Sequence, residues 1–486
     1  MLFQKYFPST IWHRLRTVPL REWPTLPLST AEGSLIFMAA FLISAALGVV
    51  RQILFNAHFG IGEEAAALYA AFRLSETIST LIAGGALTNA LVPHLLLAAR
   101  THQRTISLLV SRVLTLMLVV VIPITFVLWL AAPPLLRWFV APGLDPQTQG
   151  LATLLTRIML AELVLLVAEG VLSAVLIARG QFFLPAAGIA LRNTMIILTL
   201  LMPEPTIITV AIGSLGDSVI QLLILIPGLW HHRLHVRPAW QINDPLVRGT
   251  LRLAIPGAIS GTINYSNAIV DTAIASLGGQ AAGLGAMHNA LLLGHLPQRL
   301  CGIAIGQAAF PYLAAAAVSR DRKLFQQCWL TTITTAAFLA AMSALALIGG
   351  GRWLIRLIFE RGAFDSAAGD LTFAILQLFA LGLPIYVIVE ITGRALVALG
   401  DARTPLLANG AQLLSRIGVA TLLWPIVGVL AVPIATVASG IVEVSILCGI
   451  LWRRLYMVTE WHTIGDSTVP VIRCTADHEQ GSNQQR

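Results

Sequence analysis

Residues 34–57 read SLIFMAAFLISAALGVVRQILFNA, an apolar run with one formal charge, at Arg51. As an α-helix, about 20 apolar residues cross the roughly 30 Å hydrocarbon core of a bilayer. Similar runs occupy residues 65–97, 107–132, 151–177, 184–202, 206–229, 250–276, 283–316, 327–350, 371–398, 404–426 and 429–452. The sequence therefore predicts an all-α polytopic membrane protein with about twelve transmembrane helices, because a helix satisfies its own backbone in lipid.

The composition excludes an ordinary soluble enzyme. Of 486 residues, 57% are hydrophobic and only 11% are charged, whereas a soluble domain carries about 25% charged residues. A polar leader, residues 1–33, precedes the first apolar run, and no small-residue cleavage site closes that run. We interpret residues 34–57 as a retained span and not as a removable signal peptide.

The basic charge, +8, does not indicate nucleic-acid binding, because the arginines are scattered among apolar runs and do not gather on one solvated face. The four cysteines form no CxxC pair, so neither a disulfide framework nor a zinc site is indicated. No metal or cofactor is expected.

The loops predict the orientation of the protein in its membrane. Basic loops stay in the cytoplasm, and the loops on one side hold sixteen Lys and Arg residues. The loops on the other side hold only Arg137, Arg352, Arg356 and Arg361. This asymmetry predicts a multi-pass protein with both termini in the cytoplasm.

A weak internal repeat divides the chain. Gly60 recurs as Gly278, and Pro93 recurs as Pro311, both at an offset of 218 residues. Because six spans separate the copies, we expect two six-helix lobes of equal topology around a central cavity. The expected segments are a cytoplasmic leader (1–33), an N-lobe (34–229), a cytoplasmic linker (230–249), a C-lobe (250–452) and a polar cytoplasmic tail (453–486).

Among the charged residues inside apolar runs are Arg51, Arg73, Asp217, Asp271, Arg299 and Glu390. Each would cost about 2.5 to 3.5 kcal/mol if it faced lipid at mid-membrane depth, so we expect them to face protein or water. Asn264, Asn267 and Asp271 follow one another at steps of three and four, which places them on one helical face. A polar cavity lined by the first, second, seventh and eighth spans explains these residues. The alternative is that they join helices to one another.

Three smaller features complete the pattern. Arg299 with His295 forms either an anion clamp or a contact that stabilises the lobe. Glu390 and Arg394 are spaced for an intrahelical ion pair. Gly84, Gly85, Pro297 and Gly302 interrupt two of the cavity helices, and such interruptions suit bending during gating.

Several stretches resemble the MurJ/MviN family of lipid II flippases, in the multidrug/oligosaccharidyl-lipid/polysaccharide exporter superfamily. The resemblance covers about residues 35–452 and is carried by Leu47-Gly48-Val49-Val50-Arg51, by Ala83-Gly84-Gly85-Ala86 with Val92-Pro93, by Leu357-Ile358-Phe359-Glu360-Arg361-Gly362-Ala363-Phe364-Asp365, and by Asp401-Ala402-Arg403-Thr404-Pro405. In the first of these stretches the family usually has a second arginine, where this chain has Ala45.

The resemblance implies two six-helix lobes with a cationic cavity, in which a lipid-linked anionic glycan, lipid II, is moved between leaflets by alternating access. Arg51, Arg73 and Arg299 would contact its pyrophosphate, which arginine binds bidentately, while His295, Asn264, Asn267 and Asp271 would line the cavity. No covalent step is implied, so the protein is not expected to be an enzyme. Membrane lipids and cell-wall synthesis proteins are the other expected partners. The alternatives are an exporter of another lipid-linked oligosaccharide or amphiphile, and a non-transporting scaffold for cell-wall assembly.

Overall fold

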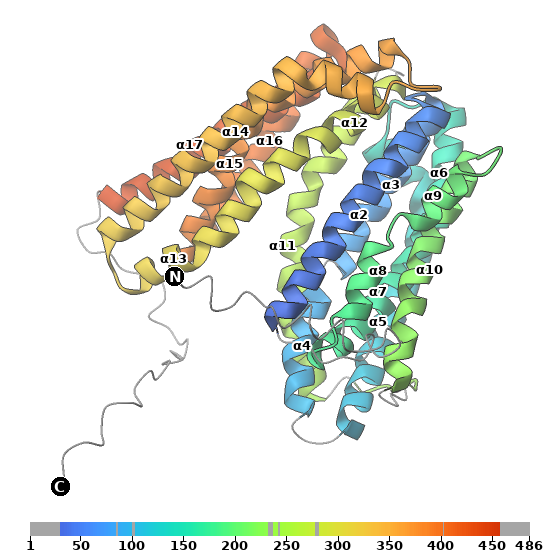
Figure 1. Cartoon of the computed structure of the whole chain (residues 1–486), viewed down its shortest axis with the longest axis vertical. Coiled ribbons are helices and arrows are strands. Elements are labelled where there is room, and N and C mark those ends of the chain that lie inside the picture. Colours follow the sequence, from blue (N-terminus) through green and yellow to red (C-terminus); the bar gives the residue numbers. More distant parts are fainter. Residues whose placement is uncertain are drawn as a thin grey trace, which may run out of the picture. The chain divides into compact units, whose positions relative to one another are not determined.

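The computed structural model describes residues 30–83, 86–99, 103–231, 237–241, 244–277, 281–401 and 403–456. Within these ranges the chain consists of helices and their connections, without a β-strand (Figure 1). The all-α prediction is confirmed. The first helix begins at Thr30, four residues before the expected start.

The first seven expected spans are all helical. The elements are α2 (Thr30–Phe59), α3 (Glu63–Ala83), α4 (Ala86–Ala99), α5 (Gln103–Leu135) with a π-helical end η3 (Leu136–Val140), α6 (Pro146–Leu160), α7 (Glu162–Ala178), α8 (Phe183–Ala190), α9 (Thr194–Leu200), α10 (Ile207–His231) and α11 (Pro245–Ser276). Two spans that hydropathy shows as continuous are broken. The span 151–177 is divided between α6 and α7, and the span 184–202 between α8 and α9.

The remaining five spans are also helical. Their elements are α12 (Ala281–Gln298), the π-helical turn η5 (Arg299–Ala304), α13 (Ile305–Val318), α14 (Arg322–Ile358), α15 (Ser366–Ala398), α16 (Arg403–Val427), the short 3-10 turn η6 (Gly428–Leu430) and α17 (Ala431–Tyr456). Gly428 has φ +58°. Glycine adopts this left-handed conformation readily. The helix α16 can therefore end at Val427, with only the turn η6 before α17.

In the described residues, nine helical segments are long and apolar enough to cross a membrane. One of them, Arg403–Leu455, contains both α16 and α17. The expected spans 65–97 and 250–276 correspond to α3 with α4 and to α11, which are helical but are not among the nine. Together these segments account for the expected helices of a polytopic membrane protein.

The chain forms two compact units. Unit 1 consists of Met1–Leu296, Ser343–Gly382 and Leu413–Ser439, and unit 2 of Pro297–Met342, Leu383–Gln412 and Gly440–Arg486. These units follow contact density, so the lobe boundaries proposed from the sequence stay predictions.

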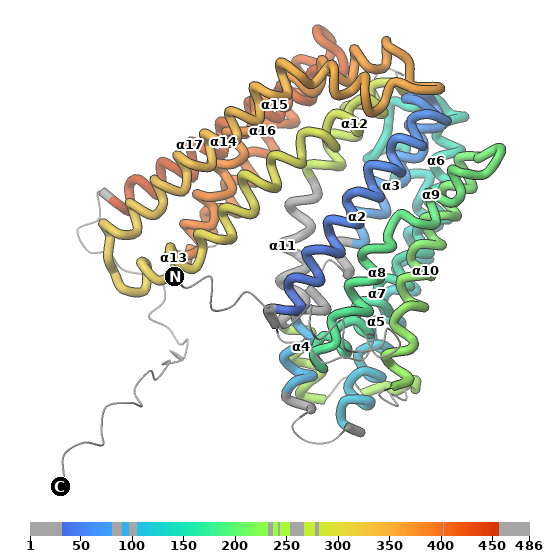
Figure 2. Tube along the Cα trace, viewed as in Figure 1, coloured from blue at the N-terminus to red at the C-terminus, as the bar shows by residue number. Residues whose placement is uncertain are grey.

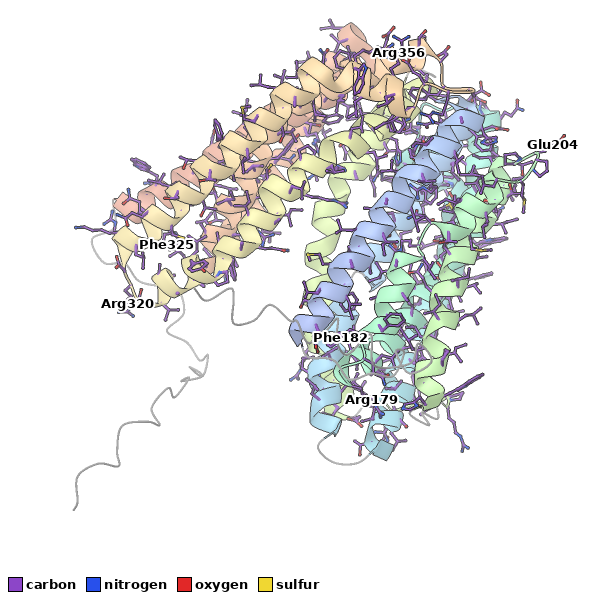
Figure 3. The ribbon with its side chains drawn as sticks, in the orientation of Figure 1. Arg179, Phe182, Glu204, Arg320, Phe325 and Arg356 are labelled. Carbon is purple, nitrogen blue, oxygen red and sulfur yellow. The ribbon has the colours of Figure 1, made fainter. Side chains whose placement is uncertain are left out.

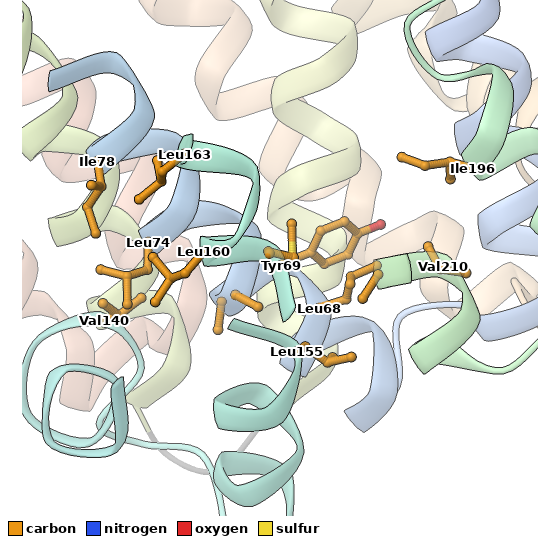
Figure 4. Packing of buried hydrophobic residues seen from close by; sticks show 14 of the residues in the cluster. Leu68, Tyr69, Leu74, Ile78, Val140, Leu155, Leu160, Leu163, Ile196 and Val210 are labelled. Carbon is orange, nitrogen blue, oxygen red and sulfur yellow. The ribbon is translucent and has the colours of Figure 1, made fainter. Parts of the chain in front are cut away.

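The core of unit 1 is built around α3, which packs against α6, α7 and α11. The side chains of Ala65, Ala66, Ala67, Ala70 and Ala71 on α3 have no solvent exposure. Such small side chains let neighbouring helices approach closely, as is usual between membrane helices. Larger residues fill the remaining space around this segment, and Figure 4 shows Leu68, Leu155 and Leu160 among them.

The two ends of unit 1 carry different loops. Figure 3 shows Arg179 and Phe182, between α7 and α8, at one end, and Glu204, between α9 and α10, at the opposite end together with Arg356. Loops that alternate in the sequence therefore lie on opposite sides of this unit, as the predicted topology requires.

Two ion pairs lie in unit 2, one within a helix and one between a loop and a helix. Arg394 donates through Nε to Oε1 of Glu390 at 2.8 Å, which confirms the predicted intrahelical pair. Asp401 accepts hydrogen bonds from the hydroxyl and amide of Thr404 and pairs with Arg454 at 2.6 Å. Burial works against ionisation of Asp401, but the Thr404 hydroxyl, backbone amides and Arg454 together hold the pKa of this carboxyl below its usual value.

Candidate functional site

A polar cavity of about 290 Å³ lies inside unit 1. Its walls come from α2, α3, α6, α7, α9, α10 and α12, together with the connection between α8 and α9. The polar side chains that line it are Arg51, Gln52, Tyr69, Ser75, Glu76, Ser79, Glu162, Arg192, Asn193, Ser214, Asp217, Ser218, Gln221 and His288. Polar groups of this number inside a bundle of apolar helices mark a candidate site for a polar ligand.

Asn193 and Asp217 together hold Arg51 at this cavity. Its Nη1 donates to Oδ1 of Asn193 at 2.8 Å. Asn193 lies at the break between α8 and α9 with φ +80°, a left-handed conformation that Asn adopts more readily than most residues. The Asp217 carboxylate, from α10, accepts the amide protons of Asn193 at 3.0 Å and of Met195 at 2.9 Å. Asp217 therefore fixes the break, and the break positions Arg51.

A second helix break places Glu162 at the same cavity. Glu162 is the first residue of α7 and follows Ala161, where α6 and α7 separate. Its Oε1 accepts a hydrogen bond from the Ser214 hydroxyl on α10. Arg192, beside Asn193, also lines the cavity, and its Nη2 lies 3.5 Å from Oε1 of Gln221. Figure 2 shows the trace of α7, α8, α9 and α10, the elements that carry these groups or flank them.

A buried amide network forms another wall. Nε2 of Gln52 donates to the Tyr69 hydroxyl at 2.7 Å and to Oδ1 of Asn289 at 3.0 Å. Nδ2 of Asn56 donates to the same Asn289 oxygen at 2.8 Å. The ring of His288 stacks on Tyr69, with 4.0 Å between centroids. This network joins α2, α3 and α12, and it orients Gln52, Tyr69 and His288 at the cavity.

Of the residues that the sequence proposed for binding, Arg51 lines this cavity and Arg73 does not. Arg73 pairs with Glu76 at 3.1 Å and donates through Nε to the Thr272 hydroxyl at 3.1 Å. These contacts join α3 to α11, which is the role that the alternative interpretation gave to such residues. Asp271, next to Thr272, is buried and lies 3.5 Å from Nε of Arg416 on α16.

The other proposed residues lie in several places. Asn267 is on α11 and its buried Oδ1 has no hydrogen-bond partner in the described part of the chain. Asn264 is on α11 too, but its side chain lies outside the described residues, as do Gly84 and Gly85.

His295 belongs to unit 1 and Arg299 to unit 2, and both are exposed. Pro297 and Gly302 flank the start of η5, where the regular helix of α12 is interrupted. A π-helical turn of this kind is often found at functional positions. Two of the four residues proposed for gating, Pro297 and Gly302, therefore lie at or beside an irregular turn, and their role in gating stays a prediction.

Sequence reasoning missed Glu162, Arg192, Asn193 and Gln221 as members of one site. Each lies on a segment whose apolar run looks continuous, and the breaks at Ala161 and at Asn193 cannot be seen in hydropathy. A usable signal was present only at Arg192-Asn193, where a charge is followed by a residue that favours left-handed backbone. In the described ranges, no three His, Cys, Asp or Glu side chains are gathered so as to hold a metal ion.

Comparisons with known proteins give a consistent result. The family model described as Lipid II flippase MurJ matches residues 55–476. A probable lipid II flippase MurJ of Rhizobium tropici is 29% identical over 434 residues, which cover 87% of this chain and 81% of the relative. A lipid II flippase MurJ of Burkholderia cenocepacia is 27% identical, covering 75% of this chain and 72% of the relative.

Solved structures show the same fold. A structure described as lipid II flippase MurJ in an inward closed conformation superposes with a TM-score of 0.73 at 23% identity, covering 86% of this chain and 87% of that one. An inward-facing multidrug resistance transporter of the MATE family, in the MOP superfamily, gives a TM-score of 0.72 at 16% identity, covering 88% and 99%.

Proposed function

Because the chain belongs to the MurJ family of lipid II flippases, we propose that it moves lipid II across the bacterial inner membrane by alternating access, with Arg51 contacting the pyrophosphate. The family and the apolar helices make it a multi-pass protein of that membrane. The cargo is a lipid-linked glycan that crosses without being chemically changed, so the protein needs a site that binds and releases an anion and no nucleophile.

The observation that carries the proposal is the guanidinium group of Arg51 in a polar cavity inside the helix bundle. Among the described residues, its guanidinium group forms one side-chain hydrogen bond, to Asn193. The second terminal nitrogen is therefore available to a phosphate oxygen. Arginine stays charged in partly buried sites and matches the geometry of phosphate. Arg192 supplies a second guanidinium group at the same cavity.

The remaining predicted residues enter the proposal as parts of the moving structure. Arg299, His295, Asn264, Asn267 and Asp271 would line the path of the head group as the helices rearrange. Pro297 and Gly302, at the irregular turn η5, would be the positions at which the eighth span bends. Both termini would lie in the cytoplasm.

Complementation tests the function. A bacterium depleted of its own lipid II flippase should grow when it expresses this chain. Arg51→Ala should abolish rescue, and Arg51→Lys should restore it in part, because lysine keeps the charge but not the bidentate geometry. Arg137→Ala is the matched control, since Arg137 is an exposed arginine that is not among the cavity-lining residues.

Binding of lipid II to the purified protein gives the magnitude. Loss of one charge-assisted contact is worth about 1.5 to 3 kcal/mol, so Arg51→Ala should weaken affinity about 10- to 100-fold. Unchanged affinity in Arg51→Ala would refute the role of Arg51. Failure of the unaltered chain to rescue growth and to bind lipid II would favour the alternatives, which are another amphiphile as cargo or a non-transporting scaffold for cell-wall assembly.

A further inference from the structure

The Glu162 carboxyl group has fewer hydrogen-bond and ion-pair partners in the described residues than the other carboxyl groups of the cavity. Glu76 pairs with Arg73, and Asp217 accepts two backbone amide protons. In the described part of the chain, Glu162 accepts one hydrogen bond, from the neutral Ser214 hydroxyl to Oε1, and forms no salt bridge. An ionised carboxylate without a counterion is costly inside a membrane protein, whereas a neutral carboxylic acid is not.

The charges around Glu162 support the same conclusion. Glu169, two turns further along α7, lies on the same helical face and interacts electrostatically with Arg192, as Glu162 does. The charged residues that line the cavity itself are three carboxyl groups (Glu76, Glu162 and Asp217) and two guanidinium groups (Arg51 and Arg192). Binding of one proton by a carboxyl group would make this lining neutral.

The cavity also has room and a polar wall for that proton to enter. Ser75 lines the cavity and is only 6% exposed. Its buried hydroxyl group has no hydrogen-bond partner in the described residues. An unpaired buried hydroxyl in a polar cavity is the kind of group that an ordered water satisfies. Because Ser75 and Glu162 line the same cavity, a water bound to the Ser75 hydroxyl would be in the cavity that Glu162 lines.

We propose that Glu162 is an exchangeable proton site that couples the protonation of the cavity to the binding of the anionic head group. On release, the O–H bond of the carboxylic acid breaks, the proton passes to water in the cavity, and the electron pair stays on Oε2. The resulting carboxylate is attracted by Arg192. This inference rests on the proposed function, because the coupling requires an anion at Arg51 and Arg192.

The sign of the coupling follows from electrostatics. A pyrophosphate bound to Arg51 and Arg192 places negative charge near Glu162 and engages the cations that would stabilise its carboxylate. Anion binding therefore favours the protonated acid, so head-group binding takes up a proton. By linkage, a lower pH must then strengthen head-group binding. Protonation on one side of the membrane and release on the other would give the transport cycle a direction.

Every charged or titratable group that faces Glu162 has to be separated from it experimentally. These groups are Asp217 from α10, Arg192 from the break between α8 and α9, Arg51 from α2, Glu76 and Tyr69 from α3, and His288 from α12. His288 is the principal rival, because an imidazole titrates in the physiological range.

Infrared difference spectroscopy of the purified full chain in lipid tests the proton site without any cargo. A pH titration should show the carbonyl band of a protonated carboxylic acid, and Glu162→Gln should remove it. Glu64→Gln is the matched control, because Glu64 is an exposed glutamate at the start of α3. His288→Gln should leave the band unchanged. Absence of the band in the unaltered chain, or its persistence in Glu162→Gln, would overturn the proposal.

Calorimetry of lipid II binding in buffers of different ionisation enthalpy tests the coupling. At a pH above the midpoint of the infrared titration, where Glu162 is ionised before binding, the unaltered chain and Glu64→Gln should take up as much as one proton on binding, and Glu162→Gln should take up none. Affinity should strengthen toward lower pH in the unaltered chain and lose this dependence in Glu162→Gln. Uptake that survives in Glu162→Gln and vanishes in His288→Gln would assign the site to His288 and refute ours.

The two experiments separate the two proposals. If lipid II does not bind but the carboxylic acid band is present and depends on Glu162, the proton site stands and the proposed cargo fails. If lipid II binds and the band is absent, the cargo stands and the proton site fails.

Discussion

The ion pair between Asp271 and Arg416 gives the sharpest test of how this bundle is stabilised. The two side chains are 11% and 7% exposed, and Nε of Arg416 lies 3.5 Å from Oδ1 of Asp271. At that distance the attraction is about 5 kcal/mol for an effective dielectric constant of about 20. Neither of the two atoms has a hydrogen-bond partner among the described residues, so part of the desolvation of both groups is not offset.

We therefore expect a large coupling free energy between Asp271 and Arg416, but only a small net contribution of the pair to the stability of the protein. Asp271→Asn or Arg416→Met alone leaves one uncompensated buried charge, which costs about 3 to 5 kcal/mol. The double variant removes both charges and should lose less stability than either single variant. Reversible unfolding in mixed micelles of a mild detergent and dodecyl sulfate, measured for all four proteins, gives the coupling free energy.

A control variant and a clear refutation accompany the cycle. Asp370→Asn removes one partner of Arg352 at a position where the Asp370 side chain is 70% exposed, and it should cost less than about 1 kcal/mol. If the effects of Asp271→Asn and Arg416→Met simply add in the double variant, the two residues are not coupled, and the buried pair does not join α11 to α16 energetically.

Two further predictions concern the loops. The pKa of the Asp401 carboxyl is held below its usual value, so ionised Asp401 stabilises the folded protein. This contribution is complete above the unfolded-state pKa of about 3.9 and is lost as pH falls through the folded-state pKa. The thermal midpoints of Asp401→Asn and of the unaltered chain should therefore differ at pH 7 and converge in acid. Gly362 has φ +61°, a Cβ there would meet the Ala57 carbonyl, and the neighbouring Ala363 amide donates to that carbonyl at 2.8 Å. Gly362→Ala should lower the free energy of unfolding by about 2 to 3 kcal/mol. Gly350→Ala, at an open helical position, should raise it by as much as about 1 kcal/mol. Equal effects of the two substitutions would contradict the argument that Gly362 is needed for its left-handed backbone.

Hydropathy predicted the helices because the bilayer imposes a length on every span. The run 34–57 became α2, and the adjacent runs 404–426 and 429–452 became α16 and α17, even though only the short turn η6 separates them. The intrahelical pair Glu390–Arg394 was predictable as well, since its geometry depends on sequence spacing alone. Interactions inside one helix can be read from the sequence.

The candidate site was only partly predictable, because its residues lie where helices stop. Periodic stripes such as Asn264, Asn267 and Asp271 assume a continuous helix. The break at Asn193 depends on Asp217, which is 24 residues away on another helix, and no local pattern shows that contact. Arg51 could be identified because a lone arginine in an apolar run is conspicuous. Arg192 could not, because its place in the site follows from a break that the sequence conceals.

These breaks explain why the polar chemistry gathers in this region. Irregular backbone at membrane depth is tolerated only where it is buried in protein or lines an aqueous cavity, and both breaks bring a charged residue to the same cavity, Glu162 at one and Arg192 at the other. Asp217 satisfies the amides that the second break exposes, and through Asn193 it also orients Arg51. The Asp217 carboxylate thus helps to determine where the guanidinium group of Arg51, the proposed anion-binding group, lies. The position of the Arg51 side chain should therefore be as sensitive to substitutions at Asp217 as to substitutions of the residues that contact Arg51 directly.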